Sequence, residues 1–220
     1  MEEKLQQERV EERVSSFDKF FEENKKTIIW TVVAILLIGA LILCYQKFYL
    51  QPKTAEAQEQ MFPAEASFRA GEYELALNGD GNTLGFAQVI DEYGTKAGKS
   101  VYFYAGLCEL QMGNYENALS YLKKYNGKDN ILAAKALGAQ GDALVGLERY
   151  SEALSVYDKA ASKIDNIFTA SLLLKAGVLC EEMGSLDKAL EYYKKIKKDY
   201  PQSMEGYDID KYITRIEASK

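Results

Sequence analysis

The chain has 220 residues, enough for one ordinary domain with appendages. Its formal charge of −6 at pH 7 argues against nucleic-acid binding, because a protein that neutralises phosphates needs clustered lysines and arginines. It contains no histidine, so the side chain most used for proton transfer near neutral pH is missing, and with it the commonest metal ligand. We therefore expect a binding protein and not an enzyme, with no cofactor, metal or small-molecule substrate.

The first 26 residues are a charged tail with one apolar stripe. Val10, Val14, Phe17 and Phe21 follow the i, i+4, i+7, i+11 spacing of one helix face. We expect residues 1–26 to form an amphipathic cytoplasmic helix that lies on the inner leaflet or runs directly into the next segment. Docking of this helix onto a partner in the membrane is the alternative.

Residues 27–46 (TIIWTVVAILLIGALILCYQ) contain no charged side chain. A helix of that length is about 30 Å long, which is the thickness of the hydrocarbon core of a bilayer. A buried core helix would carry a polar face, and a cleaved signal peptide would begin with a short basic region and end at a small-x-small site. We therefore predict an uncleaved transmembrane anchor over residues 27–50.

The basic residues around this segment predict its direction. Residues 7–26 contain five lysines and arginines, whereas residues 46–65 contain two. Because basic residues concentrate on the cytoplasmic side, we expect a cytoplasmic N-terminus and a large C-terminal part across the membrane. Trp30, Tyr45, Phe48 and Tyr49 stand where interfacial aromatic residues belong.

Residues 51–99 are predicted to be a connecting helix and a degenerate first hairpin. Phe86–Tyr93 (FAQVIDEY) aligns with the second helix of a later hairpin, and Ala76–Gly85 is expected to be a loop insertion. Asn78, Asp80 and Asn82 alternate as at the start of a calcium loop. However, the glycine and the glutamate that such a loop requires further on are absent, so we interpret this stretch as a glycine-rich turn.

The stretch Gly94–Ser100 (GTKAGKS) resembles a phosphate-binding loop. The motif needs a glycine at position 93, where the chain has Tyr93, and it should follow a strand. Because the preceding residues have a helical pattern, we predict a turn between two helices.

The second half of the chain repeats one pattern three times. The repeated segments are Gly113–Leu119 (GNYENAL), Glu148–Leu154 (ERYSEAL) and Gly184–Leu190 (GSLDKAL). Their alanines, Ala118, Ala153 and Ala189, are about 35 residues apart, close to the 34-residue period of a tetratricopeptide hairpin.

Further positions recur in register with these alanines. If each alanine is position 20 of a repeat, position 8 is glycine and position 24 is large: Gly106 and Leu122, Gly141 and Tyr157, Gly177 and Tyr193. Small residues allow two helices to cross closely, and large ones fill the layers around the crossing. Residues 100–203 therefore resemble three tetratricopeptide repeats, although Glu148 replaces a turn glycine and Glu109 stands where an apolar residue is expected.

Residues 204–220 are predicted to form a terminal helix, centred on Tyr207–Ala218, that covers the last hairpin. The predicted fold is thus all-α, with a single N-terminal transmembrane helix. It is followed by a tetratricopeptide-repeat α-solenoid of three to four hairpins and a C-terminal capping helix.

The inner groove of such a solenoid is lined by positions 2, 5, 6, 9, 12 and 13 of the first helices. The candidate partner-binding residues are Phe103, Tyr104, Leu107 and Leu110 in the first repeat, Lys135, Asp142 and Val145 in the second, and Leu174, Lys175, Val178 and Glu181 in the third. Phe103 and Leu107 occupy the positions of the lysine–asparagine clamp that receptors for acidic chaperone tails use. We therefore expect an apolar polypeptide partner, unless the upstream hairpin covers this part of the groove.

The three cysteines do not predict a disulfide framework, because the count is odd. Cys108 and Cys180 fall on first helices two repeats apart, beyond the reach of a disulfide. We expect both to be small buried hydrophobic residues.

The whole plan resembles the bacterial ancillary SecYEG translocon subunit (YfgM-type) family. The likeness is carried by Phe17–Trp30 (FDKFFEENKKTIIW) and by Phe86–Glu109. The resemblance implies an inner-membrane protein with a periplasmic repeat domain that contacts the translocon and a periplasmic chaperone. An envelope-assembly or cell-wall scaffold and a cytosol-facing organelle import receptor remain as alternatives.

Overall fold

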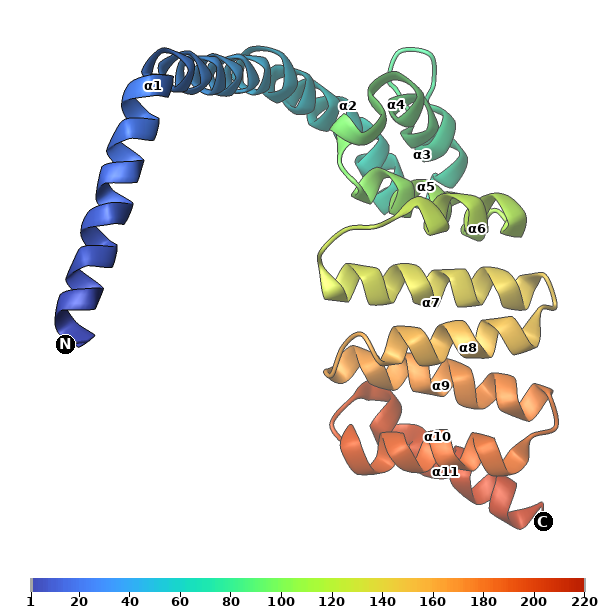
Figure 1. The fold of residues 1–220 in the computed structure, drawn as a ribbon. Helices are drawn as coiled ribbons and strands as arrows, with labels where there is room; N and C mark the ends of the chain where they lie inside the picture. The colour runs from blue at the N-terminus through green and yellow to red at the C-terminus, as the bar shows by residue number, and fades with distance from the viewer. Residues whose placement is uncertain (1, 220) are drawn as a thin grey trace. The chain divides into compact units, whose positions relative to one another are not determined.

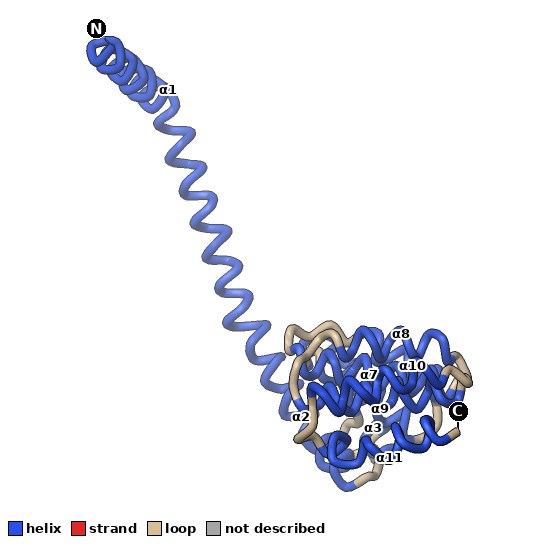
Figure 2. Tube along the Cα trace, turned by 90° about the horizontal axis from the view of Figure 1, so that it is seen from below, coloured by secondary structure: helices blue, strands red, loops and turns tan. Residues whose placement is uncertain are grey.

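The computed structural model describes the backbone of residues 2–219 and the side chains of residues 20–94 and 96–219. These described residues are helices joined by turns and loops, with no strand among them (Figure 2). The chain divides into two compact units, residues 1–53 and residues 54–220.

The first unit is helical throughout its described part. Helix α1 spans Glu2–Tyr45, and a π-helix over Gln46–Leu50 joins it to α2, Gln51–Ala70. The π-helical bond runs from the Gln51 N–H to the Gln46 carbonyl. Because Pro52 has no N–H to continue the α-helical pattern, a wider turn at this position is a natural accommodation.

Within the described residues, one helical stretch is long and apolar enough to cross a membrane, and its apolar window is not buried. A long apolar N-terminal helix is therefore confirmed, and it is not a core helix of this fold. A signal sequence near the N-terminus also passes this test of length and composition. Of the predicted tail stripe, the side chains of Val10, Val14 and Phe17 lie outside the described residues, and Phe21 is exposed.

The second unit is a stack of short helices that pack on their neighbours in chain order (Figure 1). After α2 come α3 Tyr73–Asn78, α4 Phe86–Tyr93, a 3₁₀ turn Gly94–Ala97, α5 Ser100–Gln111, α6 Tyr115–Lys124, α7 Asn130–Gly146, α8 Tyr150–Ala161, α9 Ile167–Glu182, α10 Leu186–Asp199 and α11 Met204–Ala218. Three hairpins, α5–α6, α7–α8 and α9–α10, follow one another, and α11 packs on α10 and α9. The predicted fold class, an all-α helical array, is confirmed.

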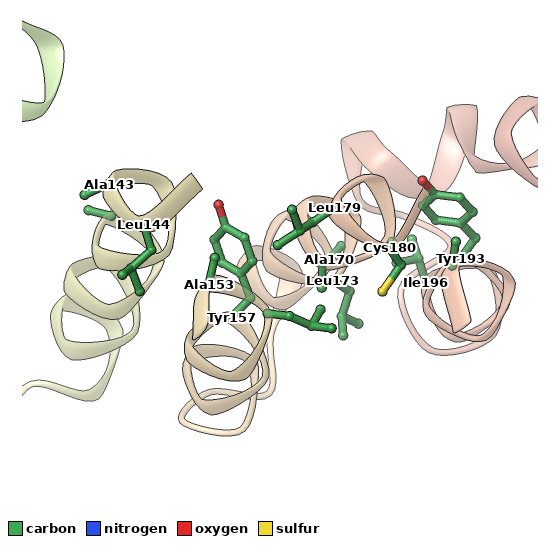
Figure 3. Close-up of a cluster of buried hydrophobic side chains, with 14 of the residues drawn as sticks. Ala143, Leu144, Ala153, Tyr157, Ala170, Leu173, Leu179, Cys180, Tyr193 and Ile196 are labelled. Atoms are coloured by element: carbon green, nitrogen blue, oxygen red, sulfur yellow. The ribbon is translucent and has the colours of Figure 1, made fainter. Parts of the chain in front are cut away.

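Each of these hairpins is closed by a close approach between its two helices. A Cβ atom added at Gly141 would lie 2.4 Å from the Tyr157 ring, and one added at Gly177 would lie 2.3 Å from the Tyr193 ring. Figure 3 shows Tyr157 and Tyr193 among the buried side chains of the core. A close-packed crossing of this kind requires glycine, because any side chain would displace the aromatic ring.

The turns inside the hairpins need a left-handed residue. Gly113 and Gly184 have φ values of 79° and 72°, and Glu148, at the equivalent place in the second hairpin, has φ 57°. The nearby Gly146 does not substitute for a turn glycine, since it gives room to the ring of Tyr115 instead. Glu148 therefore adopts a conformation that is unfavourable for a side chain with a Cβ atom.

The predicted loop Ala76–Gly85 is wrong at its start. Ala76 and Leu77 are buried and lie in α3, which packs against α5, so the loop between α3 and α4 begins at Gly79. Asp80 closes this loop: its Oδ1 accepts hydrogen bonds from the Asn82 and Thr83 N–H groups at 2.9 and 2.7 Å. These bonds, those of Thr83 first, lower the pKa of the Asp80 carboxyl. The glycine-rich turn is thus observed.

The stretch predicted to be a turn after Tyr93 is indeed a short 3₁₀ turn between two helices. Cys108 and Cys180 are free and buried, as expected, and Cys44 is free and exposed. Burial raises the pKa of the Cys108 thiol to about 12, with the Glu109 carboxylate as a second cause.

Candidate protein-binding groove

The first helices of the three hairpins, α5, α7 and α9, together line a cavity of about 290 Å³ that we call the first-helix cavity. Its lining residues are Phe103 and Leu107 of α5, Ala134, Lys135, Gly138, Ala139 and Asp142 of α7, and Ile164, Phe168, Ser171, Leu172 and Lys175 from α9 and the loop before it. Small side chains on α7 create the hollow, and larger apolar side chains from both neighbours form its walls. Such a surface can bury apolar side chains of a bound polypeptide.

At one end of the first-helix cavity lies the Asp142 carboxylate, which has hydrogen-bond donors of its own. The Asp142 carboxylate accepts hydrogen bonds from the Tyr157 hydroxyl at 2.7 Å and from Lys175 Nζ at 2.6 and 2.8 Å. Burial, and then the charge of Asp142, raise the pKa of the Tyr157 phenol, so this group remains a hydrogen-bond donor at any physiological pH. The contacts join the second hairpin to the third.

At the rim of the cavity, Lys135 Nζ lies 5.0 Å from the centroid of the Phe168 ring. A cation over an aromatic face is a favourable contact, and it leaves the ammonium group able to accept a carboxylate partner. The cavity therefore combines an apolar floor with two exposed lysines, of which Lys175 is paired with Asp142.

The structure brings together five of the eleven candidate residues predicted from sequence: Phe103, Leu107, Lys135, Asp142 and Lys175. The other predicted groove residues lie elsewhere. Leu110, Val145 and Leu174 are half-buried against the main core, Val178 is 39% exposed, and Glu181 binds Arg215 and the Tyr193 hydroxyl.

Tyr104 is the predicted groove residue that the upstream segment covers. Its ring stacks on Phe86 of α4, with centroids 5.4 Å apart, and meets the edge of Phe68 of α2 at 5.3 Å. Its neighbour Phe103 still lines the first-helix cavity. The upstream hairpin thus covers one side of α5 and leaves the other side available.

Sequence reasoning missed Gly138 and Ala139, although they stand at groove positions 5 and 6 of the second repeat. These residues have no functional side-chain group, and they contribute to the cavity because their side chains are small. Sequence reasoning also missed Ile164, in the loop before α9, and Phe168, in the first turn of α9. An exposed aromatic residue at the start of a helix is the one signal that points to Phe168.

A second cavity, of about 700 Å³, lies among α8, α9 and α10. Its carboxylates are engaged: Asp158 accepts the Tyr192 hydroxyl at 2.6 Å, and Asp165 accepts the Tyr200 hydroxyl at 2.7 Å. Asp199 pairs with Lys195 at 2.7 Å. The two tyrosine contacts join α8 and the loop after it to α10 and its C-terminal end, so we interpret them as bonds that hold the second and third hairpins together, whereas the Asp199–Lys195 pair lies within α10.

Known proteins show the same architecture. The sequence matches the tetratricopeptide repeat family over residues 109–167 and 139–203. A tetratricopeptide repeat-containing protein of Methanocaldococcus jannaschii is 36% identical over 100 residues, which are 43% of this chain and 30% of that protein. The chain thus matches about a third of the length of this relative.

Two crystal structures of MamA have a similar fold. They superpose with TM-scores of 0.53 and 0.54 at 20% and 19% identity, covering 70% and 76% of this chain and 92% and 87% of the MamA chains. At this identity the likeness concerns the fold alone.

Residues 109–203 therefore match tetratricopeptide repeats, and they lie within an all-α array of stacked hairpins. Stacked hairpins of this kind form extended surfaces that can hold other polypeptides.

Proposed function

We propose that this protein is a membrane-anchored scaffold that binds polypeptides at the periplasmic face of the bacterial inner membrane and assists their translocation or their transfer to a chaperone. The observation that carries this proposal is the apolar first-helix cavity on the same chain as an apolar helix of membrane-spanning length. The polypeptide partner would be extended or helical and apolar, and no chemistry would be done on it.

The proposed division of the chain follows the boundaries expected from its sequence. Residues 1–26 are a cytoplasmic tail and residues 27–50 the single-pass anchor. Residues 51–99 connect it to three binding repeats over residues 100–203, and residues 204–220 cap them. The excess of basic residues before the anchor supports a cytoplasmic N-terminus.

Reversible binding follows from the size of the cavity. Fully burying one leucine or phenylalanine side chain contributes about 1.5–3 kcal/mol, and ordering the bound segment offsets part of that gain. One or two buried side chains therefore give weak capture, which suits a protein that passes its partner on.

The partners we propose, the SecYEG translocon and a periplasmic chaperone, come from the resemblance of the juxtamembrane stretch Phe17–Trp30 and of Phe86–Glu109 to the YfgM-type family. An envelope-assembly or cell-wall scaffold would use the same array with other partners. A cytosol-facing organelle receptor would have the opposite orientation, which protease digestion of the repeat domain in intact cells and in spheroplasts distinguishes.

The test is photo-crosslinking in intact membranes from a reactive amino acid placed at Leu107, followed by mass spectrometry. We expect exported polypeptides together with translocon or chaperone components. The matched control is the same reactive group at Tyr104, on the same helix but covered by Phe86. Equal recovery from both positions, or none of these proteins from Leu107, contradicts the proposal.

A further inference from the structure

The two most exposed large hydrophobic side chains of the described residues are on the last helix. Met204 is 87% exposed and Tyr207 is 77% exposed, more than the apolar residues of the membrane-spanning segment. They are three residues apart in the first turn of α11, so they lie on neighbouring parts of one helix face. A single exposed hydrophobic residue is ordinary, but an exposed pair on one face is a candidate contact surface.

Acidic residues accompany this pair. Glu205 and Asp208 belong to the same two turns, and we call these four residues the cap patch. Asp208 pairs with Lys211 at 2.9 Å, while both side chains remain largely exposed. The cap patch thus consists of two exposed apolar side chains with two carboxylates beside them, one of which is paired with Lys211.

The first-helix cavity has the complementary chemistry. Its walls include Phe103, Leu107 and Phe168, and within the described part of the chain Lys135 has no carboxylate within salt-bridge distance. Its volume of about 290 Å³ is at the lower limit of small-molecule pockets, which are about 300–1,000 Å³. A cavity of this size suits one or two protein side chains better than a whole organic ligand.

The cap patch of a molecule is not free to reach the cavity of the same molecule. Ile209, Ile213 and Ile216 are buried and fix α11 against the third hairpin. Arg215 adds two hydrogen bonds of 2.7 Å to the Glu181 carboxylate of α9. A contact between the cap patch and a first-helix cavity therefore requires two molecules of the chain.

We propose that a second copy occupies the first-helix cavity: Met204 and Tyr207 of one molecule enter the cavity of another, with the cap-patch carboxylates beside Lys135. This inference rests on the proposed function, because it assumes that the cavity binds polypeptide. The two surfaces are different, so the contact is head-to-tail. Anchoring in one membrane raises the effective concentration of the partner surface, and an occupied cavity is closed to other polypeptides until it is displaced.

The first experiment tests proximity in the full-length chain, in membranes, on a Cys44→Ser background. Two differently tagged copies carry Met204→Cys and Leu107→Cys respectively. We expect a disulfide-linked pair between the two tags after mild oxidation. The matched control replaces Met204→Cys with Phe62→Cys, a similarly exposed apolar position at 66% on α2. Linkage at the control level overturns the proposal.

The second experiment tests the head-to-tail arrangement by complementation. The cap variant, Met204→Glu with Tyr207→Glu, keeps its cavity, and it should fold because acidic residues suit the first turn of a helix. The groove variant, Lys135→Glu, keeps its cap patch and changes only an exposed side chain. We expect each variant alone to associate at least about tenfold more weakly, and a mixture of the two to associate again.

Sedimentation of the detergent-solubilised chain measures this association, with Phe62→Glu as the charge-matched control. Association that survives both variants, or a mixture that stays dissociated, overturns the inference. Crosslinking from Leu107 in the cap variant distinguishes the proposed polypeptide binding from the proposed self-association. If polypeptide capture continues while self-association is lost, both stand; if capture is lost from an intact cavity, the proposed function fails.

Discussion

The regular repeats, residues 100–203, and the segment before them, residues 54–99, pack their helices in different ways. In the repeats a glycine on the first helix faces a large side chain on the second, as Gly177 faces Tyr193, and the same solution recurs three times. In the upstream segment α3 is six residues long and Pro63 lies inside α2. There the aromatic residues Phe68 and Phe86 pack together and against Tyr104 of α5.

This difference concerns how stability is distributed. In the repeats, stability is spread over several similar interfaces between neighbouring hairpins. In the upstream segment, stability depends on one cluster of a few aromatic side chains. The loss of one of them should therefore lower the free energy of local unfolding of the whole segment.

The strongest test of this contrast is Phe86→Ala. Phe86 is fully buried, and a phenylalanine truncated in a core costs about 3–5 kcal/mol. We expect α3 and α4 to exchange their amide hydrogens much faster, while α7–α10 stay protected, as measured by hydrogen exchange with mass spectrometry. The exposed Phe62→Ala is the control, with a change of about 0.5 kcal/mol or less. Uniform loss of protection along the array would show that the two regions form one cooperative unit.

A smaller effect is expected from Gly177→Ala in the regular repeats. The new Cβ atom would lie 2.3 Å from the Tyr193 ring, and overpacking of this kind costs about 1–3 kcal/mol. The gain in helix propensity, about 1 kcal/mol, offsets part of this cost. We expect a net loss of up to about 2 kcal/mol in the free energy of unfolding, measured in urea.

The same substitution in a Tyr193→Ala background serves as its control. Without the ring the added methyl group has space, so the two substitutions together should destabilise by less than the sum of their separate effects. Simple additivity would mean that the crossing of α9 and α10 relaxes without involving this pair.

The smallest expected effect is a gain. Glu148 has φ 57°, a left-handed conformation that costs a residue with a Cβ atom about 1–2 kcal/mol. Glycine removes this cost but adds chain entropy to the unfolded state, so Glu148→Gly should stabilise by about 0.5–1 kcal/mol. Thermal unfolding measures the shift, and Glu148→Gln, which removes only the charge, should leave stability nearly unchanged. An equal gain from both variants would point to the charge and not to the backbone.

Much of the array follows from short-range patterns. The positions of Ala118, Ala153 and Ala189 predict three hairpins, and the recurring glycine before each of them predicts where the helices cross. These rules are local, because a close crossing and a left-handed turn each constrain one or two residues at a known spacing. The upstream segment lacks this repetition, and there the prediction placed Ala76 and Leu77 in a loop although their burial against α5 extends the helix.

What the sequence alone determined is therefore the class of architecture, an all-α repeat array preceded by a long apolar helix, since period and composition are properties of the chain itself. Only the tertiary structure decided which groove residues are available for binding. Phe103 and Tyr104 are neighbours of similar chemistry, yet one lines the first-helix cavity and the other stacks on Phe86. The physical reason is that a cavity is the space left after all neighbours have packed, and Gly138 and Ala139 contribute to it by the side-chain atoms that they lack.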